Sequence, residues 1–212
     1  MMLVNEYGGA SQGQTEILHP SSRALFRFWE AARAEESAPS RGKLDLSRIH
    51  DLVPDLLIIE YNPAHQGFRW RLAGTRVCNL YRRELTGSVV LAGWDGFETD
   101  IVGRFLAGVV HNLQPCLLRF RMRTDLGQLI GVEMIGLPLR ACDGKNIHIF
   151  GGMFAFRETA SLGYQSIAGM ELSGARGIWT EHLPGDVLVR QLENTPNQPF
   201  QPFQVIRGGR SR

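Results

Sequence analysis

The sequence predicts an α+β fold: a five-stranded antiparallel sheet with helices on one face and a flanking helix before it. Two short strand patterns come first, a long helical pattern follows them, and three further strand patterns follow the helix. Strands grouped before and after a helix, rather than alternating with helices, are typical of an antiparallel sheet that carries its helices on one face.

The first expected element is an amphipathic helix over residues 22–36. Its apolar residues recur at helical spacing and form one stripe: Leu25, Phe28, Trp29 and Ala32. Ser21 or Ser22 can begin this helix by accepting a hydrogen bond from a free backbone amide of its first turn. The stripe needs an apolar surface to cover it, and a sheet of this chain or of a partner would provide one.

Two strands are expected next, at 56–59 and 67–73. The first is continuously apolar and lies between Pro54 and Asn62-Pro63, which predicts a central strand. In the second strand apolar and basic residues alternate, so that one face carries Phe68, Trp70 and Leu72 and the other carries Arg69 and Arg71. A longer helix is expected over about 95–111, where the residues at helical spacing are Phe97, Ile101, Phe105 and Gly108 or Val109.

The last three strands are expected at about 116–124, 128–138 and 147–157. Apolar residues alternate in the first two, and both apolar sets reach one side of the sheet only if Phe120 lies opposite Val132. This register leaves a short turn that ends at Gly127, which can adopt a positive φ. It also places Arg119 opposite Glu133 on the other side of the sheet.

Composition favours a soluble, cytoplasmic protein. The chain has 212 residues and a net charge of +2, which gives it no electrostatic footprint for nucleic acid. Its three cysteines, Cys78, Cys116 and Cys142, lack the spacing of a disulfide framework or a zinc site, and reduced thiols are expected. We find neither a secretory signal nor an apolar run long enough to span a membrane.

Four segments are expected along the chain. They are a disordered N-terminus (1–18), a flanking helix and loop (19–54), the sheet domain (55–158) and a C-terminal extension (159–212). The last part of the extension, 193–212, is rich in proline and glutamine and is expected to be a basic, flexible tail.

The most informative stretch is 68–87. Its motifs are the corner Arg71-Leu72-Ala73-Gly74-Thr75 and the closing turn Leu85-Thr86-Gly87. Together with the Phe28-Trp29 pair of the first helix and the order of the elements, these motifs resemble the PAS domains. Within that family, the chain resembles the short stand-alone PAS-like proteins of alphaproteobacteria, which carry an N-terminal helix with a Tyr-Trp or Phe-Trp pair, and the resemblance covers roughly residues 19–158.

The resemblance implies a sheet of order 2-1-5-4-3 and a non-catalytic sensory or regulatory role in bacterial signal transduction. No kinase, cyclase or phosphodiesterase module follows the sheet domain, so we expect action through partner proteins such as a histidine kinase or a response regulator. A homodimer is also expected, because related domains commonly dimerise through the N-terminal helix and the outer face of the sheet. The interface candidates are Phe28, Trp29, Arg119 and Arg121.

PAS domains can hold a small ligand between the sheet and the helices. The pocket candidates are Trp70, Leu72, Phe105, Phe120, Met134 and Met153, and the alternative is that these residues simply fill the core. The sequence does not identify a cofactor. A haem, a flavin or a fatty acid would fit the resemblance, with His111 as the haem-ligand candidate, but the cysteine motif of the flavin-binding light sensors is missing around Cys78.

A small enzyme is the third hypothesis, with Glu133 or His148 as a general base. The pairing with Arg119 favours a structural ion pair for Glu133 instead. We find no metal-ligand cluster and no second catalytic group, so no catalytic residue is assigned. Five arginines could share the outer face, as an anion-binding surface or as an ordinary solvated one: Arg69, Arg71, Arg119, Arg121 and Arg123.

Overall fold

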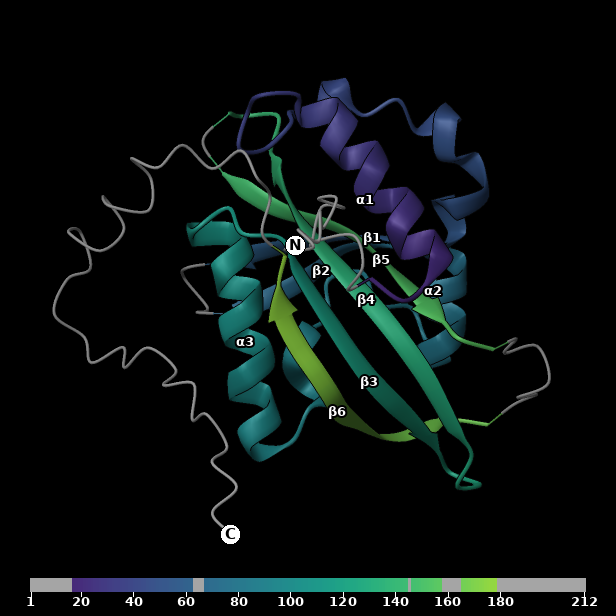
Figure 1. The fold of residues 1–212 in the computed structure, drawn as a ribbon. Coiled ribbons are helices and arrows are strands. Elements are labelled where there is room, and N and C mark those ends of the chain that lie inside the picture. The colour runs from purple at the N-terminus through teal and green to yellow at the C-terminus, as the bar shows by residue number, and fades with distance from the viewer. Residues whose placement is uncertain (1–16, 63–66, 145, 158–164, 179–212) are drawn as a thin grey trace, which may run out of the picture. The chain divides into compact units, whose positions relative to one another are not determined.

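The computed structural model describes residues 17–62, 67–144, 146–157 and 165–178 (Figure 1). All of them belong to one unit of the chain, Met1–His182. Most of the expected disordered N-terminus and the whole of the expected tail 193–212 lie outside the described residues.

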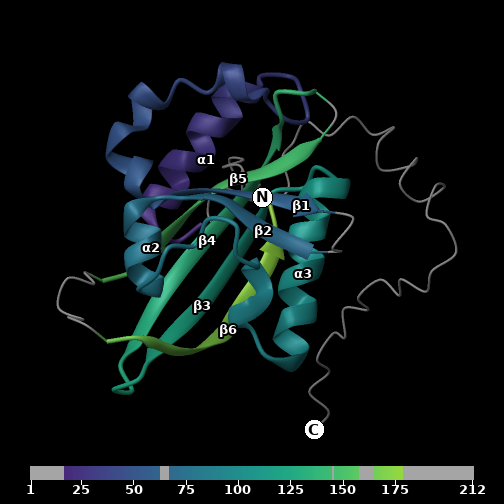
Figure 2. The ribbon, with the colours of Figure 1, turned by 180° about the vertical axis from the view of Figure 1, so that it is seen from behind.

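One antiparallel sheet of six strands forms the centre of the fold, in the order β2-β1-β5-β4-β3-β6 (Figures 1 and 2). The strands are β1 (Leu56–Asn62), β2 (Gly67–Ala73), β3 (Cys116–Thr124), β4 (Leu129–Arg140), β5 (Ile147–Ala155) and β6 (Ile167–Gly177). The first five have the expected order. The sixth pairs with β3 and lies in the segment expected to be a C-terminal extension.

Helical segments lie on both faces of this sheet. They are α1 (Pro20–Arg33), η1 (Arg41–Lys43), η2 (Leu46–Asp55), α2 (Thr75–Tyr81), η4 (Val90–Gly93) and α3 (Gly96–His111). The buried residues of α2, η4 and α3 join one hydrophobic core, and those of α1 join another. We call the face under α3 the inner face and the face under α1 the outer face.

The two cores follow from the alternation of side chains along each strand. In β1, Leu57 and Ile59 belong to the inner core, whereas Leu56 and Ile58 belong to the outer core. Neighbouring residues of a strand point to opposite faces, so a strand that is apolar throughout is buried on both. This explains why the continuous apolar run of β1 is a central strand, as expected.

The α1 helix begins two residues before the expected position and ends at Arg33 rather than residue 36. Its N-cap is His19, whose Nδ1 accepts a hydrogen bond of 3.2 Å from the Ser21 amide, so neither Ser21 nor Ser22 is the cap. Pro20 occupies the first helical position, where a missing amide hydrogen costs nothing. Ala34, with φ of 50°, ends the helix.

The hairpin between β3 and β4 has the predicted register. Phe120 lies opposite Val132 and Arg119 lies opposite Glu133. The turn is closed by a 2.9 Å hydrogen bond from the Gly127 amide to the Thr124 carbonyl, and Gly127 adopts a φ of 78°. The alternation of apolar residues was therefore sufficient to fix this pairing.

The stretch 68–87 folds back along the edge of the sheet. The Gly87 amide donates to the Trp70 carbonyl at 2.6 Å, and the Trp70 amide donates to the Ser88 carbonyl at 3.0 Å. Gly87 has a φ of 81°, and the Glu84 carboxylate accepts from the amides of Leu85 and Thr86. The closing turn thus covers the free edge of β2, which would otherwise present unpaired backbone groups.

The α3 helix spans the expected residues but buries a stripe that shares only Val109 with the expected one. Val102, Leu106 and Val109 are buried, whereas Phe97 is 73% exposed and Phe105 is half-buried. Both stripes have helical spacing and lie next to each other around the helix. The sequence pattern does not indicate which of the two stripes is buried, and packing against the sheet decides it.

Candidate functional site

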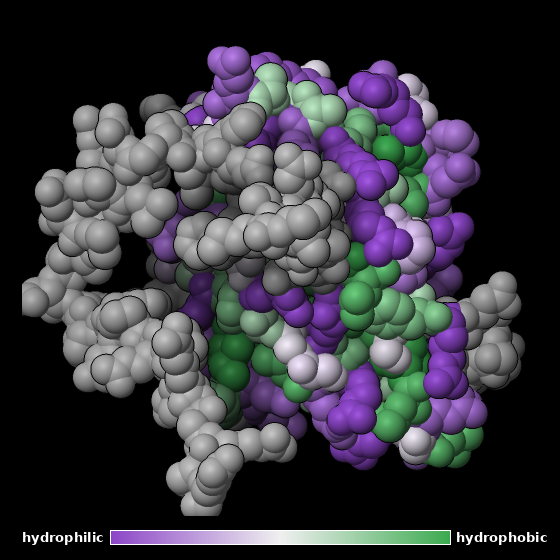
Figure 3. Space-filling view, in the orientation of Figure 1, coloured by the Kyte–Doolittle hydropathy of each residue, from purple (hydrophilic) through white to green (hydrophobic). Residues whose placement is uncertain are grey.

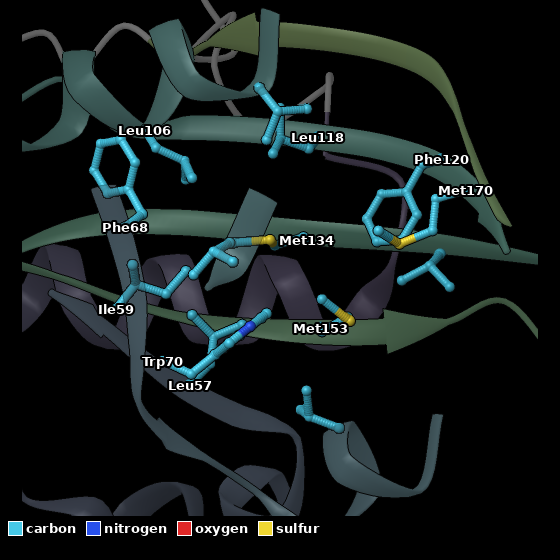
Figure 4. Close-up of a cluster of buried hydrophobic side chains, with 14 of the residues drawn as sticks. Leu57, Ile59, Phe68, Trp70, Leu106, Leu118, Phe120, Met134, Met153 and Met170 are labelled. Atoms are coloured by element: carbon cyan, nitrogen blue, oxygen red, sulfur yellow. The ribbon is translucent and has the colours of Figure 1, made fainter. Parts of the chain in front are cut away.

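Four of the six pocket candidates meet in the inner core. Trp70, Phe120, Met134 and Met153 are each at most 3% exposed and belong to one cluster (Figure 4). Phe105 is half-buried and packs against the edge of this cluster. The inner face of the sheet therefore brings together most of the residues that the alternation of the strands predicted.

Leu72 is not part of this cluster, so its place among the pocket candidates was wrong. The pairing of β1 with β2 shifts between Ile58 and Ile59, so that Ile59 lies opposite Trp70 and Ile58 opposite Leu72. The extra residue, Arg71, interrupts the alternation, and Leu72 is 41% exposed as a result. A bulge of this kind leaves no signal in the apolar pattern of a strand.

Methionine and aromatic side chains pack among the aliphatic residues of the inner core. It contains every methionine that follows Met2: Met122, Met134, Met153 and Met170. The Trp94 and Phe120 rings meet edge to face at 5.0 Å, and Trp70 meets Tyr81 in the same way at 6.1 Å. These side chains fill the interior by packing against one another, and methionine is the residue that adapts best to irregular gaps.

His111 lies elsewhere, at the C-terminal end of α3. Its exposed ring meets the Tyr61 ring edge to face at 5.4 Å. It lines an open hollow at the end of the sheet together with His148 and the ion pair of Arg71 with Glu60, whose atoms are 2.9 Å apart. None of the six pocket candidates lines this hollow. The structure therefore does not bring His111 together with the pocket candidates.

Burial lowers the pKa of His148, and the positive charge of Arg71 lowers it further. This imidazole is therefore neutral at physiological pH. Among the described residues, we find no group of three or more histidine, cysteine or acidic side chains placed to hold a metal ion.

The interface candidates lie on the outer face, where α1 covers the sheet of its own chain. Trp29 is 1% exposed, and its Nε1 donates to the Pro138 carbonyl at 2.8 Å. Leu25 and Phe26 are buried beside it, and Phe28 is half-buried against the same core. Of the two surfaces that could cover this helix, its own sheet is the one observed, so Trp29 is not available to a partner.

Glu133 is the anchor of this helix. One carboxylate oxygen accepts hydrogen bonds from the Arg119 Nε at 2.8 Å and the Leu18 amide at 3.1 Å, and the other accepts from the His19 amide at 2.8 Å. The side chain of Glu133 is fully buried. The interpretation of Glu133 as a structural ion pair rather than a free base is confirmed, because both oxygens already have donors.

The electrostatics of Glu133 agree with this role. Burial by itself raises the pKa of this carboxyl, but the hydrogen bonds from Arg119 and from the His19 and Leu18 amides outweigh it, and the net pKa is below the ordinary value of 4.5. Glu133 is therefore ionised at physiological pH and holds the start of α1 through charge-assisted hydrogen bonds.

The five arginines do not form one surface. Arg121 and Arg123 lie on β3 and share the Glu171 carboxylate of β6, at 3.2 and 3.7 Å. Arg69 and Arg71 lie on β2, at the opposite end of the strand order. Of the two alternatives, the shared surface of all five arginines is therefore not observed; the alternation of one strand carries no information on where that strand lies in the sheet.

Sequence reasoning missed the residues that β6 contributes. Met170 enters the inner core and Glu171 pairs with the arginines of β3. The Glu98 carboxylate of α3 accepts a hydrogen bond of 3.0 Å from the Leu172 amide. The strand contains three glycines, Gly169, Gly174 and Gly177, and its weak β propensity gave no signal.

Comparison with known proteins identifies the family. The family profile described as PAS domain matches residues 17–154, from the segment before α1 to the end of β5. The search of curated proteins found no match. No helix among the described residues is both long and apolar enough to cross a bilayer. PAS domains are sensory and regulatory modules, typically without catalysis. On the strength of its match over most of its length, the chain belongs to the PAS-domain family.

Proposed function

We propose that this protein is a non-catalytic, cytoplasmic PAS regulator of bacterial signal transduction that acts by binding another signalling protein, such as a histidine kinase or a response regulator. The proposal depends mainly on the structural role of Glu133. The best-placed buried carboxylate of the domain anchors α1 to the sheet instead of facing a substrate. The carboxylate of Glu133 thus holds α1 in place on the outer face of the sheet.

The part of the outer face that α1 leaves uncovered supports a contact with a partner. At the hairpin end of the sheet, Leu18 is 53%, Leu129 40% and Phe156 47% exposed. Phe156 packs over Gly131 of β4, and its ring also meets His19, the residue after Leu18, at 5.5 Å. Figure 3 shows hydrophobic surface at this end of the face. We call it the hairpin patch.

The charge beside the hairpin patch favours an acidic partner. Arg121 and Arg123 share the single carboxylate of Glu171, so this group keeps a net positive charge. Apolar residues bordered by arginine are typical of protein interfaces. We therefore assign the patch to a signalling protein with an apolar and acidic surface.

A cross-linking experiment in the native bacterium tests this assignment. A photoreactive amino acid replaces Leu129 in the tagged full chain, and the cross-linked proteins are identified by mass spectrometry. We expect kinases or response regulators to be enriched and the Phe156→Asp variant to lose them. Phe97→Asp is the matched control, because Phe97 is 73% exposed on α3, away from the patch. Equal capture by both variants, or capture of no signalling protein, would contradict the proposal.

The homodimer expected from the resemblance stays a prediction. Sedimentation velocity of the full chain over a range of concentrations measures it. If Phe156→Asp converts a dimer to a monomer, a second copy and not a signalling partner occupies the hairpin patch.

A further inference from the structure

An open hollow lies at the end of the sheet where β4 turns into β5. It has a volume of about 840 Å³ and is lined by residues at the ends of β1, β5 and α3, by the β4–β5 turn, by β2 and by η1. Leu129 begins β4 and Phe156 follows β5, so the hairpin patch lies at the opposite ends of these two strands (Figure 1). We call this feature the strand-end hollow.

The charged part of the strand-end hollow lies on the outer face of the sheet. Ile59 and Ile149 lie opposite each other and belong to the inner core, so their neighbours Glu60 and His148 point to the outer face. His148 also lies opposite Leu139, which belongs to the outer core. The sheet therefore separates this part of the hollow from the inner core.

Two guanidinium groups lie close enough to His148 to lower its pKa by their charge, Arg71 on β2 and Arg41 at the start of η1. Arg71 is held by Glu60 at 2.9 Å. In the part of the chain that the structure describes, neither the Arg41 side chain nor the half-buried His148 imidazole has a hydrogen bond or an ion pair. Guanidinium and imidazole groups are the donors that bind a carboxylate or a phosphate most strongly.

The two acidic side chains of the hollow already have donors. Glu60 pairs with Arg71, and the Asp143 carboxylate accepts hydrogen bonds from the Asn146 amide at 3.0 Å and from its side-chain nitrogen at 2.6 Å. The charged lining therefore needs acceptors rather than donors, and a ligand with an anionic group would supply them at Arg41.

The remaining lining is aromatic and apolar. The Tyr61 ring packs against the Phe68 ring at 5.2 Å and the His111 ring at 5.4 Å, which fixes its orientation. Val110 and Ile147 also line this part of the hollow. We call Tyr61, Val110 and Ile147 the aromatic wall. Ligand sites commonly combine such a wall with a few polar groups that orient the ligand.

We propose that the strand-end hollow binds a small organic anion, with its carboxylate or phosphate group at Arg41, Arg71 and His148 and its apolar body on the aromatic wall. None of the six pocket candidates lines this hollow, so the site is separate from the pocket that the resemblance implies. It is also independent of the partner at the hairpin patch, which lies at the other end of the strands.

NMR titration of the full chain tests the site with benzoate, phenyl phosphate and the neutral amide benzamide. We expect saturable shifts centred on Arg41 and His148 with one or both anions, and none with benzamide. Binding of only one anion would identify the head group as carboxylate or phosphate. The absence of a saturable shift with either anion in the millimolar range, or equal binding of benzamide, would overturn the proposal.

Variants of opposite sign test the assigned contacts. We expect Arg41→Gln to weaken binding of the anion by about five- to tenfold, the value of a partly exposed charged hydrogen bond. Glu60→Gln should strengthen it, because the carboxylate that occupies Arg71 is removed. Arg104→Gln is the matched control, since Arg104 is exposed on α3 and does not line the hollow. An unchanged affinity in Arg41→Gln, or no gain in Glu60→Gln, would overturn the assignment.

The pKa of His148 provides a further readout. Burial and the charges of Arg71 and Arg41 lower it, and the carboxylates of Glu60 and Asp143 oppose them. A bound anion adds negative charge beside the imidazole, so we expect this pKa, followed by NMR, to rise when the anion saturates the hollow. An unchanged pKa at saturation would show that the anion does not lie at His148, and would overturn the proposed placement.

Discussion

The Glu133 carboxylate on β4 accepts a 2.8 Å hydrogen bond from the Arg119 guanidinium on β3, directly opposite it in the sheet. The same carboxylate binds the two backbone amides that lead into α1. A pair that could be expected from the register of a hairpin is thus also the attachment point of a helix more than a hundred residues away in the sequence.

Removing the Glu133 carboxylate should detach the start of α1. We expect Glu133→Ala to lower the free energy of unfolding by about 3–5 kcal/mol, because Arg119 would be left without its buried partner. Urea denaturation measures the loss. The control is Arg121→Ala, whose ion pair is about half exposed and should contribute about 0–1 kcal/mol. Similar losses in the two variants would contradict the anchoring role.

Acid should weaken this anchor. The pKa of Glu133 is lower in the folded protein than its ordinary value of 4.5, so its contribution to stability is complete above that value and is lost as the pH falls through the folded-state pKa. We expect the difference in unfolding free energy between the wild type and Glu133→Gln to be constant near neutral pH and to shrink under acid conditions. A difference that grows on acidification would show that burial, not hydrogen bonding, controls this group.

Trp29 should stabilise the outer face both by packing and by its hydrogen bond. Trp29→Phe removes the bond to the Pro138 carbonyl and should cost about 1–3 kcal/mol of unfolding free energy. Trp29→Ala also leaves a cavity and should cost about 3–5 kcal/mol. Phe28→Ala is the comparison, because Phe28 is half-buried and should lose less than Trp29→Ala. An equal loss from both alanine variants, measured in urea, would contradict the observed packing.

Gly151 should tolerate no side chain. A Cβ at this position would collide with the Ile135 carbonyl oxygen of the neighbouring strand, whereas a Cβ at Gly174 would meet open space. We expect Gly151→Ala to lose about 3 kcal/mol or more, or to fail to fold. Gly174→Ala should be neutral or stabilising by up to about 1 kcal/mol, because alanine restricts the unfolded chain. Thermal unfolding of the two variants compares them directly, and a small loss in Gly151→Ala would show that the strands can separate locally.

The sequence was a good guide wherever one side of an element is buried and the other is not. The alternation in β3 and β4 predicted the pairing of Phe120 with Val132 and, through it, the ion pair of Arg119 with Glu133. It was a poor guide where two sets of residues on one element have the same period. The stripe of α3 that includes Phe97 and the stripe that includes Leu106 are equally helical, and only the second faces the sheet.

The sequence by itself determined the order of the elements and most of the inner core, and both depend on local periodicity. The order of the first five strands came from the resemblance to PAS domains, which depends on motifs such as the corner at Gly74. The tertiary structure decided which sheet α1 covers, the bulge that exposes Leu72 and the pairing of β6. Each of these features depends on contacts between segments far apart in the sequence. The observed arrangement is the one that buries more apolar area and forms more hydrogen bonds. A glycine-rich strand such as β6 has almost no local preference for the β conformation, and it forms because it pairs with the otherwise open edge of β3.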